Sequence, residues 1–130
     1  MTENIETGVL EAMLNTLPVE VSFVNANDEV TYLNKNGDRI FPRTRSIVGR
    51  KVQQCHPQKS LHKVTQILEA FKSGERDVAE FWINLKGRQI YIRYFPVKDI
   101  DGKYLGTIEV SQDITEIKEI EGEKRLLDWK

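Results

Sequence analysis

One short segment gathers the residue types that most often bind metals or act as nucleophiles. Residues 49–64, "GRKVQQCHPQKSLHKV", contain the only cysteine, Cys55, and both histidines, His56 and His62. Zinc sites use pairs of closely spaced ligands, and two adjacent residues with one distant histidine do not supply such pairs. A cysteine–histidine nucleophile pair needs side chains that face each other, which adjacent residues rarely do. The sequence therefore predicts neither a metal site nor nucleophilic catalysis here.

Cys55 is expected to be a buried apolar side chain. Val48, Val52 and Cys55 follow one another at four- and three-residue spacing, which is the spacing of one helical face. A buried free cysteine behaves as a small apolar residue. His56 precedes Pro57, which disfavours helical backbone at His56 and places it where the next helix begins. Two interpretations of His56 stay open, a hydrogen bond to backbone, which is favoured, or a contact with a ligand.

The bulk composition narrows the function classes. The chain has 130 residues, which fits one domain, and 19 basic against 20 acidic residues leave no excess that favours nucleic acid or a membrane surface. No segment has the length and hydropathy of a membrane span or a signal peptide. One cysteine cannot form an internal disulfide, and we expect a cytoplasmic protein. Phosphate-binding loops, nucleophile motifs and paired carboxylates with a clear geometry are not evident, so we do not expect an enzyme.

Hydrophobic periodicity predicts an α+β domain. A five-stranded antiparallel sheet, with short helices on one face and flanking terminal helices, accounts for the order of elements. We expect an N-terminal amphipathic helix at residues 1–17, the domain proper at 18–115 and a C-terminal linker helix at 116–130. Within the domain, the expected elements are strands at 19–25 and 29–34, short helical pieces at 35–55, a longer helix from Pro57, and strands at 77–85, 90–97 and 103–115.

Several motifs in this order resemble the PAS sensor domain. They are the opening hairpin "LPVEVSFVNANDEVTYLN", the central "SIVGRKV", and the closing strands "LKGRQIYIRYFPVKDIDGKYLGTIEVSQDIT", which end in "DIT". The resemblance covers about residues 14–115. The segment "GRKVQQCHPQKS" is similar to a PAS subgroup that follows hemerythrin-like regions, which implies that the chain is one piece of a longer signalling protein.

The resemblance implies a small-molecule sensor or a signal-relay module. Such domains hold a ligand between the inner face of the sheet and the central helices, and transmit through the flanking helices, usually as dimers. A light-sensing flavin domain of the LOV kind is excluded, because its reactive cysteine lies three residues after the motif glycine, where this chain has Val52.

Haem and non-covalent flavin remain alternative cofactors. Haem-binding PAS domains use an inward histidine on the longer helix, and iron accepts imidazole readily. His62 is near that position, but Leu61 has the apolar helical neighbours, so Leu61 is expected to face inward and His62 outward; His56 is the other candidate ligand. Some flavin-binding PAS domains carry a tryptophan in the strand that here contains Trp82, although strand aromatics usually pack in cores or dimers.

The candidate ligand-binding residues are therefore Cys55, His56, Leu61, Trp82, Ile92, Tyr94 and Ile108. Which face of each strand points inward stays open, because both faces carry apolar side chains. A basic cluster that includes Arg43, Arg45 and Arg50 near the pocket entrance would suit either solvent or a carboxylate ligand.

Two functions of different classes follow from these observations. The first is a ligand-binding sensor domain, and the second is a ligand-free module for dimerisation and relay. Apolar stripes on both terminal helices, such as Val9 and Met13 near one end and Ile117 and Ile120 near the other, predict a homodimer.

Overall fold

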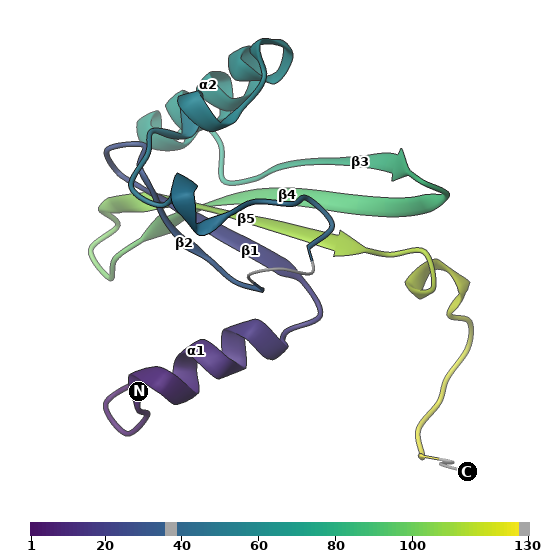
Figure 1. Cartoon of the computed structure of the whole chain (residues 1–130). Coiled ribbons are helices and arrows are strands. Elements are labelled where there is room, and N and C mark those ends of the chain that lie inside the picture. Colours follow the sequence, from purple (N-terminus) through teal and green to yellow (C-terminus); the bar gives the residue numbers. More distant parts are fainter. Residues whose placement is uncertain (36–38, 128–130) are drawn as a thin grey trace.

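The computed structural model describes residues 1–35 and 39–127 (Figure 1). Its elements are α1 (Thr7–Thr16), β1 (Glu20–Asn25), β2 (Val30–Leu33), η1 (Arg45–Ile47), η2 (Val52–Cys55), α2 (Gln58–Ser73), β3 (Ala79–Leu85), β4 (Arg88–Lys98), β5 (Tyr104–Asp113) and η3 (Ile117–Glu119). The strands form one antiparallel sheet in the order β2–β1–β5–β4–β3. The expected α+β fold, with five antiparallel strands and helices beside them, is confirmed.

Strand register determines which side chains share a face of the sheet. Tyr94 of β4 pairs with Ala79 of β3 and with Glu109 of β5, and Glu109 pairs in turn with Ser22 of β1. Paired residues point to the same side of a sheet. We call this the inner face, because α2 covers it, whereas α1 lies on the other side of the molecule in Figure 1.

The core lies between α2 and the inner face. α2 buries Val64, Leu68 and Phe71, which have the three- and four-residue spacing expected for its apolar stripe. Val64 and Leu68 join Val24, Val30 and Val52 in one buried cluster. Gly74, in the left-handed conformation with φ of 79°, ends the helix and donates its amide to α2 carbonyls.

Val48 is not part of the inward face that helical spacing predicted. It is 45% exposed, whereas Val52 is 6% exposed. The segment is not one helix: η1 and η2 are separate 3₁₀ turns, and both Val48 and Lys51 have extended backbone between them. Helical periodicity therefore does not apply across this stretch, and only the part of the prediction that concerns Val52 and Cys55 agrees with the structure.

The predicted C-terminal helix at residues 116–130 is wrong for the described part of that segment. Only the single turn η3 is helical, and no helix follows it as far as Leu127; residues 128–130 lie outside the described residues. Gly122 has a left-handed φ of 63°, which interrupts a helix, and Ile120 is 73% exposed. A short amphipathic helix is marginal in water without a partner surface, so one chain alone does not stabilise it. Among the described helices, none is long and apolar enough to cross a membrane.

Candidate functional site

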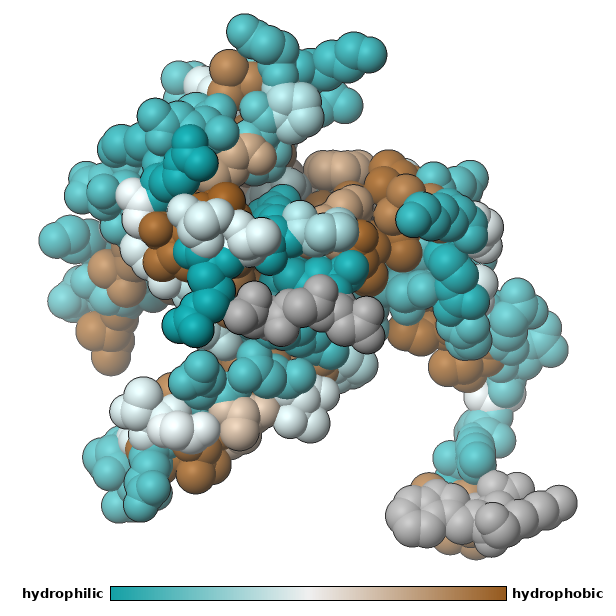
Figure 2. Space-filling model, viewed as in Figure 1, coloured by the Kyte–Doolittle hydropathy of each residue, from teal (hydrophilic) through white to brown (hydrophobic). Residues whose placement is uncertain are grey.

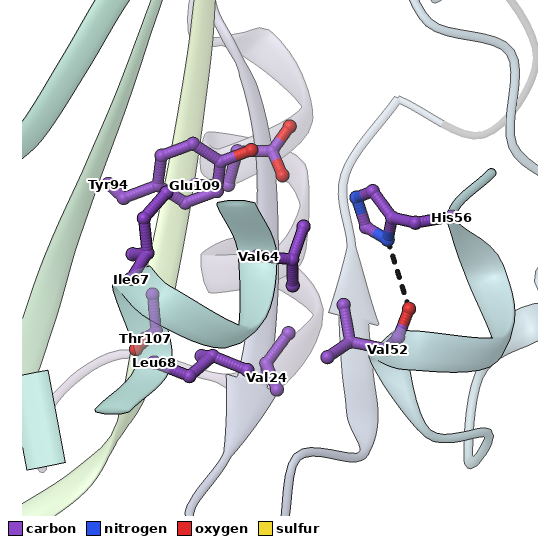
Figure 3. Close-up of a pocket in the computed structure, with 9 residues that line it drawn as sticks. All are labelled: Val24, Val52, His56, Val64, Ile67, Leu68, Tyr94, Thr107 and Glu109. Atoms are coloured by element: carbon purple, nitrogen blue, oxygen red, sulfur yellow. Dashed lines mark hydrogen bonds between the residues drawn. The ribbon is translucent and has the colours of Figure 1, made fainter. Parts of the chain in front are cut away.

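A small cavity lies between α2, η2 and the inner face of the sheet (Figure 3). Five of its lining residues are aliphatic, and the other four carry polar atoms. The lining residues are Val24, Val52, His56, Val64, Ile67, Leu68, Tyr94, Thr107 and Glu109. The volume open to a water-sized molecule is about 20 Å³, which is roughly the room that one water needs. In this conformation the site is nearly closed.

Glu109 brings a mostly buried carboxylate to this site. Its side chain is 12% exposed, and its Oε1 lies 3.5 Å from a guanidinium nitrogen of Arg43. The Tyr94 hydroxyl lies beside the carboxylate in Figure 3. The pKa of Tyr94 is raised, first by burial and then by the negative charge of Glu109, so this phenol stays protonated and can donate a hydrogen bond. The Arg43 guanidinium is at a distance longer than a normal hydrogen bond, and Arg39 also interacts electrostatically with Glu109.

A second buried ion pair lies on the same face. Arg39 and Glu20 approach to 3.6 Å, and their side chains are 3% and 5% exposed. Glu20 also accepts hydrogen bonds from the backbone amides of Ile40 and Phe41. The two ion pairs, Arg39–Glu20 and Arg43–Glu109, join the segment around Arg39–Arg43 to β1 and β5, which are adjacent in the sheet. A change in the contacts of Glu109 therefore acts on this segment through Arg43.

His56 makes the backbone hydrogen bond that its sequence position favoured, and its ring also lines the cavity. Its Nδ1 is hydrogen-bonded to the carbonyl of Val52 at 2.9 Å, which is the expected backbone contact. The same ring lines the cavity, and Figure 3 shows it across from Tyr94 and Glu109. The backbone contact fixes the ring, so its other nitrogen has a defined position at the cavity wall.

The predicted site residues divide between the two faces of the sheet. Tyr94 lines the cavity and Ile92, 5% exposed, lies on the same inner face. Trp82 and Ile108 lie on the opposite, outer face: Trp82 pairs with Tyr91 and is 62% exposed, and Ile108 is next to Glu109 in the alternation of β5. Their prediction as residues of this pocket is wrong, because alternate residues of a strand point to opposite sides.

The two remaining candidates, Cys55 and Leu61, do not line the cavity. Cys55 is half-buried against the core cluster, and its Sγ donates to the carbonyl of Lys51 at 3.5 Å. Leu61 is half-buried at the start of α2. His62 is exposed, as the helical spacing indicated, so it does not point toward the cavity where a haem iron would lie. Within residues 1–35 and 39–127, no group of three His, Cys, Asp or Glu side chains is placed to hold a metal ion.

The sequence analysis missed Glu109 and Thr107 as cavity residues. The only indication in the sequence was that Glu109 lies between two β-branched residues in "GTIEVS". A charged residue in a strand is ordinarily explained as an exposed position. Only the register shows that this position faces α2. The basic cluster was noticed, but its member Arg43 turns out to be the ion-pair partner of a buried acid.

A polar junction forms where the chain leaves the sheet. Asp113 accepts hydrogen bonds from Arg88 Nε at 2.7 Å and from the Thr115 hydroxyl and amide. Arg88 also pairs with Glu116, and the Thr115 hydroxyl accepts the Gln89 amide. These contacts, first of all the bond from Arg88, lower the pKa of Asp113 to about 2. The "DIT" motif thus connects the end of β5 to the start of β4.

Comparisons with known proteins agree with this architecture. The PAS domain family matches residues 10–115. The crystal structure of a C-terminal domain from Streptococcus mutans is 36% identical, with a TM-score of 0.83 over 88% of this chain and 90% of that one. No curated protein matches the sequence.

More distant structures share the fold. A sensory box sensor histidine kinase from Vibrio cholerae is 15% identical, with a TM-score of 0.58 over 82% of this chain and 90% of that one. A PAS domain from Colwellia psychrerythraea is 14% identical, with a TM-score of 0.56 over 84% and 97%. The family match covers most of the chain, includes every strand and the "DIT" junction, and supports a role in signal sensing or relay. The chain therefore belongs to the PAS domain family.

Proposed function

We propose that this PAS domain is a non-catalytic sensor that binds a compact, mainly apolar molecule with one N–H or O–H donor. The observation that carries the proposal is the carboxylate of Glu109, which is mostly buried at a cavity with five aliphatic lining residues, beside the Tyr94 hydroxyl and 3.5 Å from the guanidinium of Arg43. A buried charge is costly unless it is hydrogen-bonded, so a donor from a ligand would be bound strongly there. The single free cysteine suits a cytoplasmic location.

The cavity must widen to admit such a ligand, and the attachment of α2 allows this. Among the described residues, no hydrogen bond or ion pair joins α2 to β1, β4 or β5, and α2 packs through Val64, Leu68 and Phe71. One ion pair, from Lys72 near the end of α2 to Asp28 in the β1–β2 turn at 2.8 Å, holds the C-terminal end of the helix, so the N-terminal end is the part that can move. Apolar contacts are not directional, so the N-terminal part of α2 can shift at modest cost while the Lys72–Asp28 ion pair holds the other end. Haem and flavin are much larger than this cavity, and a smaller ligand fits the geometry better.

Binding at Glu109 has a short route to the exit junction. Glu109 lies four residues before Asp113 on β5, so both belong to one strand. A ligand donor that competes with Arg43 for Glu109 would weaken the Arg43–Glu109 ion pair. The segment around Arg39–Arg43 would then be held less firmly against β5. The junction of Asp113, Arg88 and Glu116 would pass that change to the residues that follow the domain.

The donor requirement is testable with two probes of nearly equal shape. Indole has an N–H donor and benzofuran has none, so indole should bind with about tenfold or higher affinity. Methyl NMR of labelled protein should show indole-dependent shifts at Val24, Val64 and Leu68. In Glu109→Gln, which preserves size and leaves a neutral amide oxygen as the acceptor, the preference for indole over benzofuran should fall several-fold.

The matched control is Glu69→Gln on the exposed side of α2, which should bind indole as the wild type does. Equal affinity for the two probes in the wild type, or no shift at any cavity methyl group, would contradict the proposed sensor function.

A homodimer is the second candidate function, and exposed apolar surface favours it. Trp82 is 62% exposed on the outer face, and Val9 and Met13 of α1 are 50% and 52% exposed. Figure 2 shows hydrophobic surface over α1. Arg93 lies over the Tyr91 ring at 4.7 Å on the same face, and its Nε is buried with no hydrogen-bond partner among the described residues. We propose that a second copy of the chain covers both apolar surfaces. In a two-fold dimer the same surfaces of both copies enter the interface, so the apolar area buried is doubled.

Light scattering should report a dimer at tens of micromolar, the concentration range where a modest apolar interface forms. Met13→Glu and Trp82→Glu should each weaken the dimer by about tenfold or more, because each buries a charge in the interface. Ile100→Glu is the control: Ile100 is fully exposed in the turn between β4 and β5 and should not matter. A monomer at these concentrations would count against this proposal.

A further inference from the structure

A larger groove lies between α1, β2 and the arginines Arg39, Arg43 and Arg45. The volume open to a water-sized molecule is about 230 Å³, far larger than in the central cavity. Its lining residues are Glu11, Asn15, Thr31, Tyr32, Leu33, Arg39, Arg43, Arg45 and Val48. We propose that this groove binds a small zwitterion with a carboxylate and an ammonium group, the chemistry of a free α-amino acid.

The groove presents unused hydrogen-bond donors. Asn15 accepts the Lys35 amide with its Oδ1, so its own amide group is left to donate. The Tyr32 hydroxyl is buried and, within the described residues, has no hydrogen-bond partner. Burial is also the first cause that raises the pKa of Tyr32, so the hydroxyl remains a donor. An acceptor-rich group such as a carboxylate would satisfy both side chains.

The arginines supply the positive charge that a carboxylate needs. Arg39 is paired with Glu20 and Arg43 with Glu109, whereas Arg45 is exposed and makes no ion pair among the described residues. Arg39 and Arg43 lie close enough for the charge of Arg43 to contribute to the lowered pKa of Arg39, although burial is the larger cause. Arg45 is therefore the guanidinium available for a bidentate contact with a carboxylate.

Glu11 makes the groove suitable for a zwitterion rather than a simple anion. It lines the groove from α1, and its negative charge is the second cause, after burial, of the raised pKa of Tyr32. It has no ion-pair partner within the described residues. A carboxylate ligand alone would be repelled by Glu11, whereas an ammonium group on the same ligand would pair with it. Leu33 and Val48 add apolar surface for an aliphatic side chain.

Three probes that share one aliphatic body separate these contributions. L-Leucine carries both charges, 4-methylpentanoate lacks the ammonium and isopentylamine lacks the carboxylate. Calorimetry with the full chain should show L-leucine binding about threefold or more tightly than either analogue, because an ion pair with an exposed side chain contributes up to about 1 kcal/mol. NMR should show the side-chain amide signal of Asn15 shifting with L-leucine.

Arg45→Gln and Glu11→Gln should each weaken L-leucine binding about threefold, and both residues are exposed, so these variants should fold. Arg50→Gln, an exposed arginine that does not line the groove, should bind as the wild type does. Absence of L-leucine binding, equal binding of 4-methylpentanoate, or unchanged affinity in Arg45→Gln would each overturn the proposal. Neither Arg45 nor Glu11 lines the central cavity, so this result is separate from the indole test.

Discussion

Replacing Gly106 by alanine should lower the free energy of unfolding by about 3 kcal/mol, among the larger effects of a single substitution. Gly106 has a φ of 156°, a backbone conformation that other residues rarely adopt. An added Cβ would lie 2.2 Å from the Val24 carbonyl oxygen and 2.5 Å from the Phe23 ring. The carbonyl is backbone, so β1 and β5 would have to separate. Denaturant unfolding followed by circular dichroism measures the change.

Gly102→Ala is the matched control for this prediction. Gly102 also has positive φ, 84°, but nothing lies within 4 Å of the position where its Cβ would be. Its cost should be that of the strained backbone alone, about 1–2 kcal/mol. If both variants lost the same stability, the close approach of β1 and β5 at Gly106 would have no energetic consequence. Val24 and Thr107, the neighbour of Gly106, both line the central cavity. Separation of β1 and β5 in Gly106→Ala should therefore also weaken indole binding, and Gly102→Ala should not.

Strand and helix order was predictable because it depends on local periodicity. The alternation of apolar residues identified all five strands, and the stripe of Val64, Leu68 and Phe71 identified the buried side of α2. Turn chemistry was also local: Gly87, together with Lys86, has positive φ at the β3–β4 turn. These features require no information about which elements come together in space.

The face of each strand could not be predicted, because it depends on where α2 packs. Trp82 and Tyr94 both belong to alternating strands with apolar residues on each side, and only the register assigns Tyr94 to the inner face. Glu109 illustrates the same limit, since a charged strand residue is normally expected to face solvent. The failure at Val48 has another cause, namely two 3₁₀ turns where a continuous helix was assumed.

Asn34→Ala should destabilise the domain by about 3 kcal/mol and release α1. Asn34 is fully buried, and its Oδ1 accepts the Val21 amide at 2.6 Å while its Nδ2 donates to the carbonyls of Leu14 and Val19 at 2.8 and 3.1 Å. Alanine would leave these backbone groups without partners, and each buried unpaired group costs about 1–3 kcal/mol. Denaturant unfolding measures the stability, and hydrogen exchange of the α1 amides measures the release.

The release of α1 follows from how little else attaches this helix. No residue of α1 is buried, and its C-terminal end meets the domain through the Leu14 carbonyl and the Asn15 side chain, which bind Asn34 and Lys35. Exchange in α1 should therefore accelerate more than in α2. Asn27→Ala, at an exposed asparagine in the β1–β2 turn, should change stability by no more than about 0.5 kcal/mol. Unchanged exchange in α1 of Asn34→Ala would show that other contacts position this helix. In that case the groove between α1 and β2 would persist without Asn34, and L-leucine binding should persist with it.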